Sequence, residues 1–112
     1  MKSPWYEYLN KLDKEKRDIV VTILAIAKKH TLEPEETMSY GVPTLKSNGN
    51  YIIAVAAHKN HVGVYPFGEA PIIAVKHMLG DVKTSKGTIC FPYNALPTEE
   101  QLAAIVAFNL NR

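Results

Sequence analysis

The sequence predicts an α+β fold, in which helices pack against an antiparallel sheet. Apolar residues recur every three or four positions near both ends of the chain, whereas residues 36–65 alternate with a period of two. The predicted order is two helices, strands joined by hairpins, a middle helix, a further strand and a last helix, which is typical of α+β architecture. The chain has 112 residues, the length of one domain, so we treat residues 1–112 as a single domain.

Two helices are expected at the start of the chain. Ser3 and Pro4 are suited to cap and begin a short helix, and Asp13 is suited to cap a second helix that runs to about His30. The second helix has one apolar face, made by Ile19, Val20, Ile23, Leu24 and Ala27.

Three strands are expected in the middle, at about 37–47, 50–58 and 61–66. Asn48-Gly49 is a strong signal for the first hairpin turn, and Lys59-Asn60 suits a second two-residue turn. Counting outward from the two turns places these residues on a core face: Val42, Thr44, Ile53, Val55, Ala57, Val62 and Val64.

The other face of the predicted sheet is built around very small residues. Larger residues, among them Leu45, Ile52 and Tyr65, surround the small ones, which are Gly41, Ala54, Ala56 and Gly63. This pattern indicates a shallow hollow that a ligand, another segment or a partner chain covers. A bulge near Pro43 would change the sorting beyond it.

The last third of the chain has three more predicted elements. A helix is expected over about 69–78, with Pro71 in its first turn and Gly80 as its stop, and a strand over 87–91. Thr98 and Gln101 have the spacing of a capping box for a final helix.

Composition excludes several classes of protein. The chain has 13 basic and 11 acidic residues and a net charge of +2, with only two arginines, which does not favour nucleic-acid binding. A lone cysteine, Cys90, cannot form an internal disulfide and is typical of a reducing compartment. The longest apolar stretch, residues 19–27, is too short to cross a membrane, so we expect a cytoplasmic protein without a membrane partner.

A first candidate site is the pair His58 and His61. The predicted turn between them makes the two imidazoles cross-strand neighbours, close enough to share a metal. Completing such a site needs a third ligand from Ser39, Tyr65, Glu36 or a carboxylate elsewhere. The alternative, which is more frequent for histidines at a hairpin end, is a solvated or hydrogen-bonded pair.

A second candidate is the segment 83–88, Lys-Thr-Ser-Lys-Gly-Thr. Its hydroxyls and backbone N–H groups can donate to an oxyanion while the two lysines supply charge. It lacks the spacing of a nucleotide-binding phosphate loop, so nucleotide hydrolysis is not indicated. A polar loop that leads into a strand is the alternative interpretation.

A third candidate is the acidic group Glu33, Glu35 and Glu36, whose carboxylates suit Fe(II), Mn or Mg unless they are simply solvated. Cys90 lies in an apolar strand and is expected to be inert. Because no set of residues supplies a nucleophile, a base and a stabilising group together, we expect no enzyme.

Three segments, residues 36–43, 59–66 and 83–92, together resemble the YdhG-like family of small bacterial proteins, a domain of unknown function. The resemblance covers nearly the whole chain and implies helices against an antiparallel sheet. It also implies a polar and basic site, provided that the two loops lie together; with the hollow beside them, its residues are Ser39, Tyr40, Lys59, His61, Tyr65, Lys83, Ser85 and Lys86. Position 58 is usually aromatic in the family pattern, whereas this chain has His58.

Some members of that family carry the label iron chaperone or frataxin-like. The label implies delivery of Fe(II) to iron–sulfur assembly proteins, here through Glu33, Glu35 and Glu36. Two alternatives stay open. One is a binding module for a small anionic molecule or an acidic peptide at the Lys/His/Ser site, and the other is a homodimer that forms through the small-residue face with Tyr65 and Leu45 as anchors.

Overall fold

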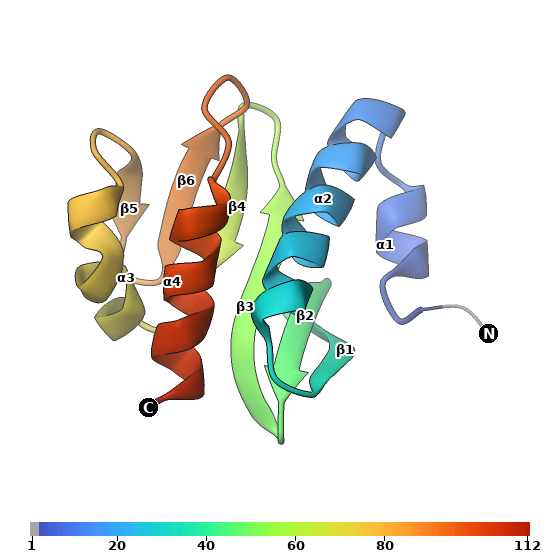
Figure 1. Ribbon diagram of the computed structural model, residues 1–112. Coiled ribbons are helices and arrows are strands. Elements are labelled where there is room, and N and C mark those ends of the chain that lie inside the picture. Colours follow the sequence, from blue (N-terminus) through green and yellow to red (C-terminus); the bar gives the residue numbers. More distant parts are fainter. Residues whose placement is uncertain (1–2) are drawn as a thin grey trace.

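The computed structural model describes residues 3–112 and has two layers, with helices packed on one face of a six-stranded antiparallel sheet (Figure 1). The sheet has the order β1-β2-β3-β4-β6-β5. Its strands are β1 (Pro34–Ser39), β2 (Val42–Ser47), β3 (Asn50–Ala57), β4 (His61–Tyr65), β5 (Lys83–Ser85) and β6 (Thr88–Pro92). The helices are α1 (Tyr6–Asn10), α2 (Lys14–His30), α3 (Glu69–Val75), which a 3₁₀ turn (Lys76–Met78) extends, and α4 (Glu99–Leu110). The predicted α+β class is confirmed.

The N-termini of the helices show which of the predicted capping residues form their hydrogen bonds. Asp13 accepts a hydrogen bond from the Lys16 N–H at 2.8 Å, and Thr98 and Gln101 form the predicted capping box. The first helix begins later than predicted, because the Ser3 hydroxyl accepts from the N–H of Trp5, and Trp5 is the N-cap of α1. This five-residue helix is too short to be stable alone and is anchored by the Trp5 indole, which donates to the Thr37 carbonyl at 2.8 Å.

Both predicted hairpin turns are present. Asn48 and Gly49 have left-handed φ angles of 50° and 82°, as a two-residue turn of this type requires, and Ser47 pairs with Asn50 across it. At the second turn, the His58 N–H donates to the His61 carbonyl at 2.9 Å. Strands β3 and β4 therefore pair in the predicted register.

The predicted single strand 37–47 is wrong, because the chain reverses at Tyr40-Gly41. Both residues have positive φ, 53° and 77°, and the turn divides the segment into the hairpin β1–β2. The prediction failed because tyrosine is not a residue that usually begins such a turn. In the same way, residues 83–85, predicted as loop, form strand β5 and pair with β6 across a turn at Lys86-Gly87.

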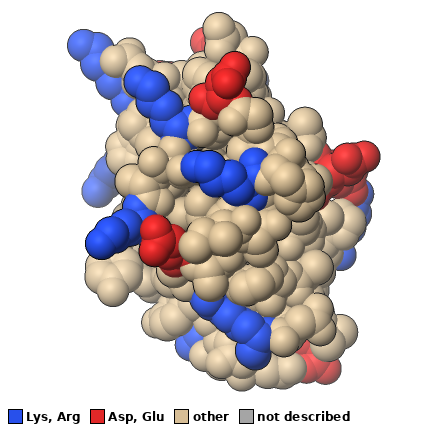
Figure 2. Space-filling view, turned by 90° about the vertical axis from the view of Figure 1, so that its left-hand side faces the viewer, with Lys and Arg blue, Asp and Glu red and all other residues tan. Residues whose placement is uncertain are grey.

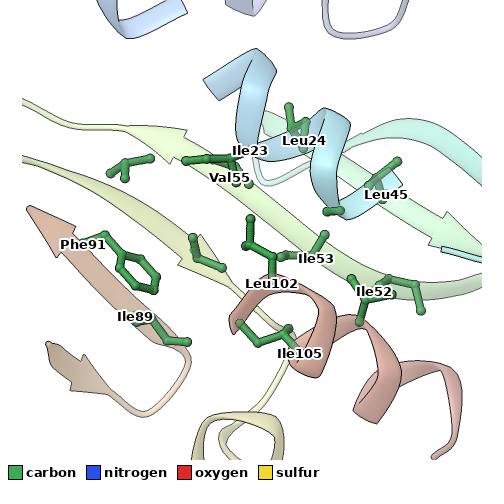
Figure 3. Close-up of a cluster of buried hydrophobic side chains, with 14 of the residues drawn as sticks. Ile23, Leu24, Leu45, Ile52, Ile53, Val55, Ile89, Phe91, Leu102 and Ile105 are labelled. Carbon is green, nitrogen blue, oxygen red and sulfur yellow. The ribbon is translucent and has the colours of Figure 1, made fainter. Parts of the chain in front are cut away.

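The predicted sorting of β2 is also wrong, because a bulge shifts its register with β3. Lys46 faces Tyr51 but Leu45 faces Ile53, which leaves Ile52 as an extra residue. Leu45 and Ile52 consequently enter the helix-covered core (Figure 3), while Val42 and Thr44 turn to the opposite face. Leu45 is 0% exposed and cannot anchor a homodimer as proposed from the sequence.

The core lies between the sheet and the helices. Side chains of α2, α4 and the central strands interdigitate there, as Figure 3 shows for Leu24, Ile53 and Leu102. None of the helices described between residues 3 and 112 combines the length and the apolar run that crossing a bilayer needs. The arrangement leaves the sheet face away from α2, α3 and α4, here called the open face, without a helical cover (Figure 1).

Candidate functional site

One hollow of the molecule lies on the open face, where the bulge has gathered small and β-branched residues. Ala54 faces Thr44 across β2 and β3, Ala56 faces Gly63 across β3 and β4, and Ser39 faces Val42. Because these side chains are short, a cavity of about 620 Å³ remains above them, within the range of small-molecule sites. We call it the open-face cavity; it is lined by Ser39, Tyr40, Val42, Ala54, Ala56, His58, Tyr65, Phe67, Gly68 and Gly87.

Two aromatic residues that line the cavity have left-handed backbone conformations. Tyr40 (φ 53°) is the first residue of the β1–β2 turn, and Phe67 (φ 58°) follows the end of β4. A left-handed conformation is unfavourable for residues with a side chain, on the order of 1 kcal/mol or more, and is often retained at functional sites. Phe67 stacks on Tyr51 with ring centroids 4.9 Å apart, and Arg112 donates to its carbonyl oxygen at 2.5 Å.

The side chains of His58 and Tyr65 form a polar part of the cavity wall. The His58 Nε2 and the Tyr65 hydroxyl are 2.7 Å apart, and the His58 ring stacks on His61 with centroids 4.6 Å apart. Burial lowers the pKa of His58, and the nearby charge of His61 lowers it further. Burial also raises the pKa of Tyr65, with smaller contributions from Cys90 and Tyr8. At neutral pH both groups are therefore uncharged, and the phenol O–H can donate to the imidazole nitrogen.

The position of Tyr65 depends on the absence of a side chain at Gly63. A Cβ atom on Gly63 would lie 2.7 Å from the Tyr65 hydroxyl oxygen and 3.0 Å from its ring carbon Cζ. The Tyr65 ring thus lies over Gly63 and reaches His58. A glycine inside a strand indicates such a close approach, which is the signal that the sequence offered here.

Comparison with known proteins identifies the architecture. Neither a family model nor a curated protein matches the chain. Among solved structures, it is similar to a protein of the DUF1801 family from Bacillus subtilis, YdhG, with a TM-score of 0.88, 21% sequence identity, and coverage of 96% of this chain and 89% of that chain.

The chain has the YdhG fold. The resemblance seen in the sequence is thereby confirmed in the architecture. At 21% identity the likeness establishes the fold alone, and a fold can support many activities. What the protein does must be argued from its own residues.

The YdhG fold separates the residues predicted to form one polar and basic site. Ser39, Tyr40 and Tyr65 line the open-face cavity. His61 and Lys83 line a second hollow of about 710 Å³, which also includes Cys90.

The remaining predicted residues, Lys59, Ser85 and Lys86, are exposed and line neither hollow. Strands β4 and β6 run antiparallel, with His61 opposite Pro92, so the turns that carry Lys59 and Lys86 lie at opposite ends of these strands. The expectation that the two loops lie together is therefore wrong. Figure 2, which looks onto the side of the molecule that carries α3 and β5, shows basic side chains dispersed and interleaved with acidic ones.

The three residues of the acidic group, Glu33, Glu35 and Glu36, are also separated in the structure. Glu33 lies in the turn before β1, and Glu35 and Glu36 alternate along β1, so they point to opposite sides of the strand. Glu36 is held by Ser3 and by Lys28, 2.9 Å away. Partial burial acts to raise its pKa, but the hydrogen bonds from Ser3 and Lys28 and the Lys28 charge outweigh that effect and lower it. Across residues 3–112, no three His, Cys, Asp or Glu side chains gather as a metal-binding group.

The sequence predicted part of the cavity and missed the rest. It placed Ala54, Ala56, His58 and Tyr65 on one face correctly, because both turns of β3 carry clear signals. It missed Val42, Phe67, Gly68 and Gly87. Val42 changed face with the bulge, and the other three reach the cavity only because the β4–α3 loop and the β5–β6 turn both border it. The Phe67-Gly68 pair after β4 is the local signal that was available.

Proposed function

We propose that this protein binds a small, uncharged organic molecule in the open-face cavity and holds it without converting it. The observation that carries the proposal is the cavity itself, which combines a floor of Ala54 and Ala56 with a few hydrogen-bonding groups at its walls. Among residues 3–112, no Lys, Arg, Asp or Glu lines it. A cavity of this kind supports binding through apolar burial, with orientation set by the polar groups.

Two polar groups are available to orient a ligand. The Ser39 hydroxyl has no hydrogen-bond partner within the described residues 3–112, so it can both donate to and accept from a ligand. The Tyr65 hydroxyl is paired with His58 Nε2, and when its proton is directed to that nitrogen the oxygen can still accept a hydrogen bond from a ligand. A Tyr65 oxygen that accepts favours a ligand with a donor, such as a neutral amide or a hydroxyl compound, over a carboxylate, which only accepts.

The same groups support the proposal that the protein binds its ligand without converting it. The cavity wall offers a hydroxyl at Ser39, but within residues 3–112 no base is hydrogen-bonded to it, and His58 is engaged with Tyr65. Nucleophilic catalysis requires a nucleophile within reach of its base. The arrangement supports a binding protein.

The test is a titration of the full chain, followed in ¹⁵N–¹H correlation spectra, with benzamide and cyclohexanecarboxamide as uncharged probes and benzoate as a charged one. We expect the uncharged probes to shift resonances of cavity residues. Gly63→Ala should weaken both by about tenfold, because the new methyl displaces the Tyr65 ring from the wall while the fold persists. Ile73→Ala, at an exposed site of α3 outside the cavity, is the matched control.

Two results would contradict the proposal. One is the absence of shifts at cavity residues with any uncharged probe. The other is tighter binding of benzoate, with shifts at Lys59 or at residues 83–86 that weaken in high salt, which would favour the anion-binding module.

Iron delivery, which the family resemblance implies, is a second proposal. Its support is that Glu33, in the turn before β1, and Glu35, near the start of β1, are exposed carboxylates two residues apart in the chain. Oxygen ligands of this kind suit Fe(II), and weak, exposed binding suits a protein that hands its cargo to iron–sulfur assembly partners. Glu36 contributes less to this proposal, because Lys28 and Ser3 already occupy its carboxylate.

A further inference from the structure

Aromatic rings surround the open-face cavity on several sides. Tyr40 comes from the β1–β2 turn, His58 and Tyr65 from the β3–β4 hairpin, and Phe67 from the loop after β4. The floor between them is made of methyl groups. The aromatic and apolar character of the cavity walls therefore indicates the chemical class of the ligand, which the cavity volume alone does not.

Three of the four rings are fixed before any ligand arrives. The Phe67 ring stacks on Tyr51, and Arg112 donates a hydrogen bond to the Phe67 backbone carbonyl. His58 is held between its stacking on His61 and the hydrogen bond to Tyr65, whose ring meets it edge-on at 6.5 Å and 72°. Preorganised rings of this kind lose little entropy on binding.

Tyr40 is the exception. Its side chain is 96% exposed, and no hydrogen bond or ring contact holds it within residues 3–112. It nevertheless lines the cavity, so a ring that no contact holds is free to change rotamer at the cavity mouth.

The neighbouring hairpin shows that tyrosine is not the residue that this turn requires. Asn48-Gly49 has φ angles of 50° and 82°, and Tyr40-Gly41 has 53° and 77°, so the two turns share one conformation. Asparagine tolerates the left-handed conformation better than tyrosine does. Tyrosine at position 40 thus costs stability, and its 96% exposed side chain gains no packing against the described residues 3–112 that offsets this cost.

We infer that the ligand is a flat aromatic compound, and that Tyr40 closes over it as an aromatic lid. This inference rests on the proposed function. A flat ring contacts the methyl floor across its whole face and meets the surrounding rings edge-on or stacked, whereas a puckered ring does neither. Each aromatic pair formed in this way increases affinity by about two- to tenfold.

The test compares benzamide with cyclohexanecarboxamide, which have the same polar group and differ in the flatness of the ring. On the full chain we expect benzamide to bind at least tenfold more tightly. Tyr40→Asn should reduce the affinity for benzamide about fivefold, leave that for cyclohexanecarboxamide unchanged, and raise the thermal midpoint because Asn suits the turn. Tyr40→Phe should keep the benzamide affinity, and Ile73→Ala is the control for an exposed apolar side chain.

The possible results distinguish a failure of this inference from a failure of the proposed function. Equal binding of both probes in the cavity would overturn the aromatic assignment and leave the proposed function standing. A preference for benzamide that is as large in Tyr40→Asn as in the wild type would overturn the lid. Absence of any shift at cavity residues would overturn the proposed function itself.

Discussion

His58 connects the chemistry of the cavity to the stability of the fold. Its ring touches His61 on one face and Tyr65 at its edge, and its carbonyl accepts from the Tyr93 hydroxyl at 2.6 Å. Protonation would place a positive charge in a partly buried position beside a second imidazole. The lowered pKa of His58 expresses this cost.

The lowered pKa of His58 predicts a pH dependence of stability. Since the folded state binds a proton less readily than the unfolded state, whose histidine titrates near pH ~6.5, this contribution is complete above that pH and is lost as the pH falls through the folded-state pKa. We expect the unfolding free energy of the wild type to fall between pH 7.5 and 5.5 by about 0.5 kcal/mol more than that of His58→Phe, a small difference because water screens the ring. Urea denaturation at several pH values measures it.

His77→Phe, in the 3₁₀ turn Lys76–Met78, is the control for the removal of a histidine. Parallel pH profiles for the wild type and His58→Phe would contradict the prediction.

At the level of elements, the bulge between β2 and β3 decides what the open face contains. It places Leu45, Ile52 and Ile53 together in the core and turns Val42 into the cavity. One tertiary contact holds it. The side-chain amide of Asn109, in α4, donates to the carbonyl oxygens of Ile52 at 2.6 Å and Pro66 at 2.8 Å. The same residue therefore ties down the bulge and the start of the loop that carries Phe67.

Replacing Asn109 should substantially lower the free energy of unfolding. Asn109→Leu leaves two carbonyl groups without their donor, which we expect to cost about 2 kcal/mol of unfolding free energy. Asn109→Asp should cost more, about 3 kcal/mol or above at pH 7, because a carboxylate would face two carbonyl oxygens, and the deficit should shrink in acid. Chemical denaturation measures both variants, with the same changes at exposed Asn111 as controls. Losses within 0.5 kcal/mol at Asn109 would show that the bulge persists without this contact.

At the scale of the whole molecule, charge is distributed without a strong field. The 13 basic and 11 acidic residues nearly balance, and several acidic groups are engaged by bases, as Glu99 is by Lys29 at 2.5 Å. Iron delivery would depend on the exposed carboxylates Glu33 and Glu35 rather than on a broadly acidic surface. The proposal of iron delivery therefore has less support than the proposal that the open-face cavity binds a ligand.

The iron proposal makes its own prediction. In anaerobic calorimetry we expect any Fe(II) binding to be lost in the double variant Glu33→Gln and Glu35→Gln, because a neutral amide is a much weaker ligand. Glu69→Gln, in the first turn of α3, controls for the removal of one exposed negative charge. No heat with the wild type, or the same heat with the double variant, would exclude this edge as an iron site.

The sequence by itself determined the features that local chemistry controls. The Asp13 and Thr98 caps, the Asn48-Gly49 turn and the period of two along β3 each act over a few residues, so composition and spacing predict them. The α+β class and the small-residue hollow follow from these features.

Only the tertiary structure decided which residues share the open-face cavity. The carbonyl of the bulged residue Ile52 is hydrogen-bonded by Asn109, a residue 57 positions away in the chain, and Phe67 and Gly87 reach the cavity from segments with no local reason to meet. The predicted grouping of Lys59 with Lys86 failed because the antiparallel pairing of β4 and β6 sends their turns to opposite ends. A bulge moves the side chains of β2 beyond it to the other face, so a correct local pattern could not predict which of them line the cavity.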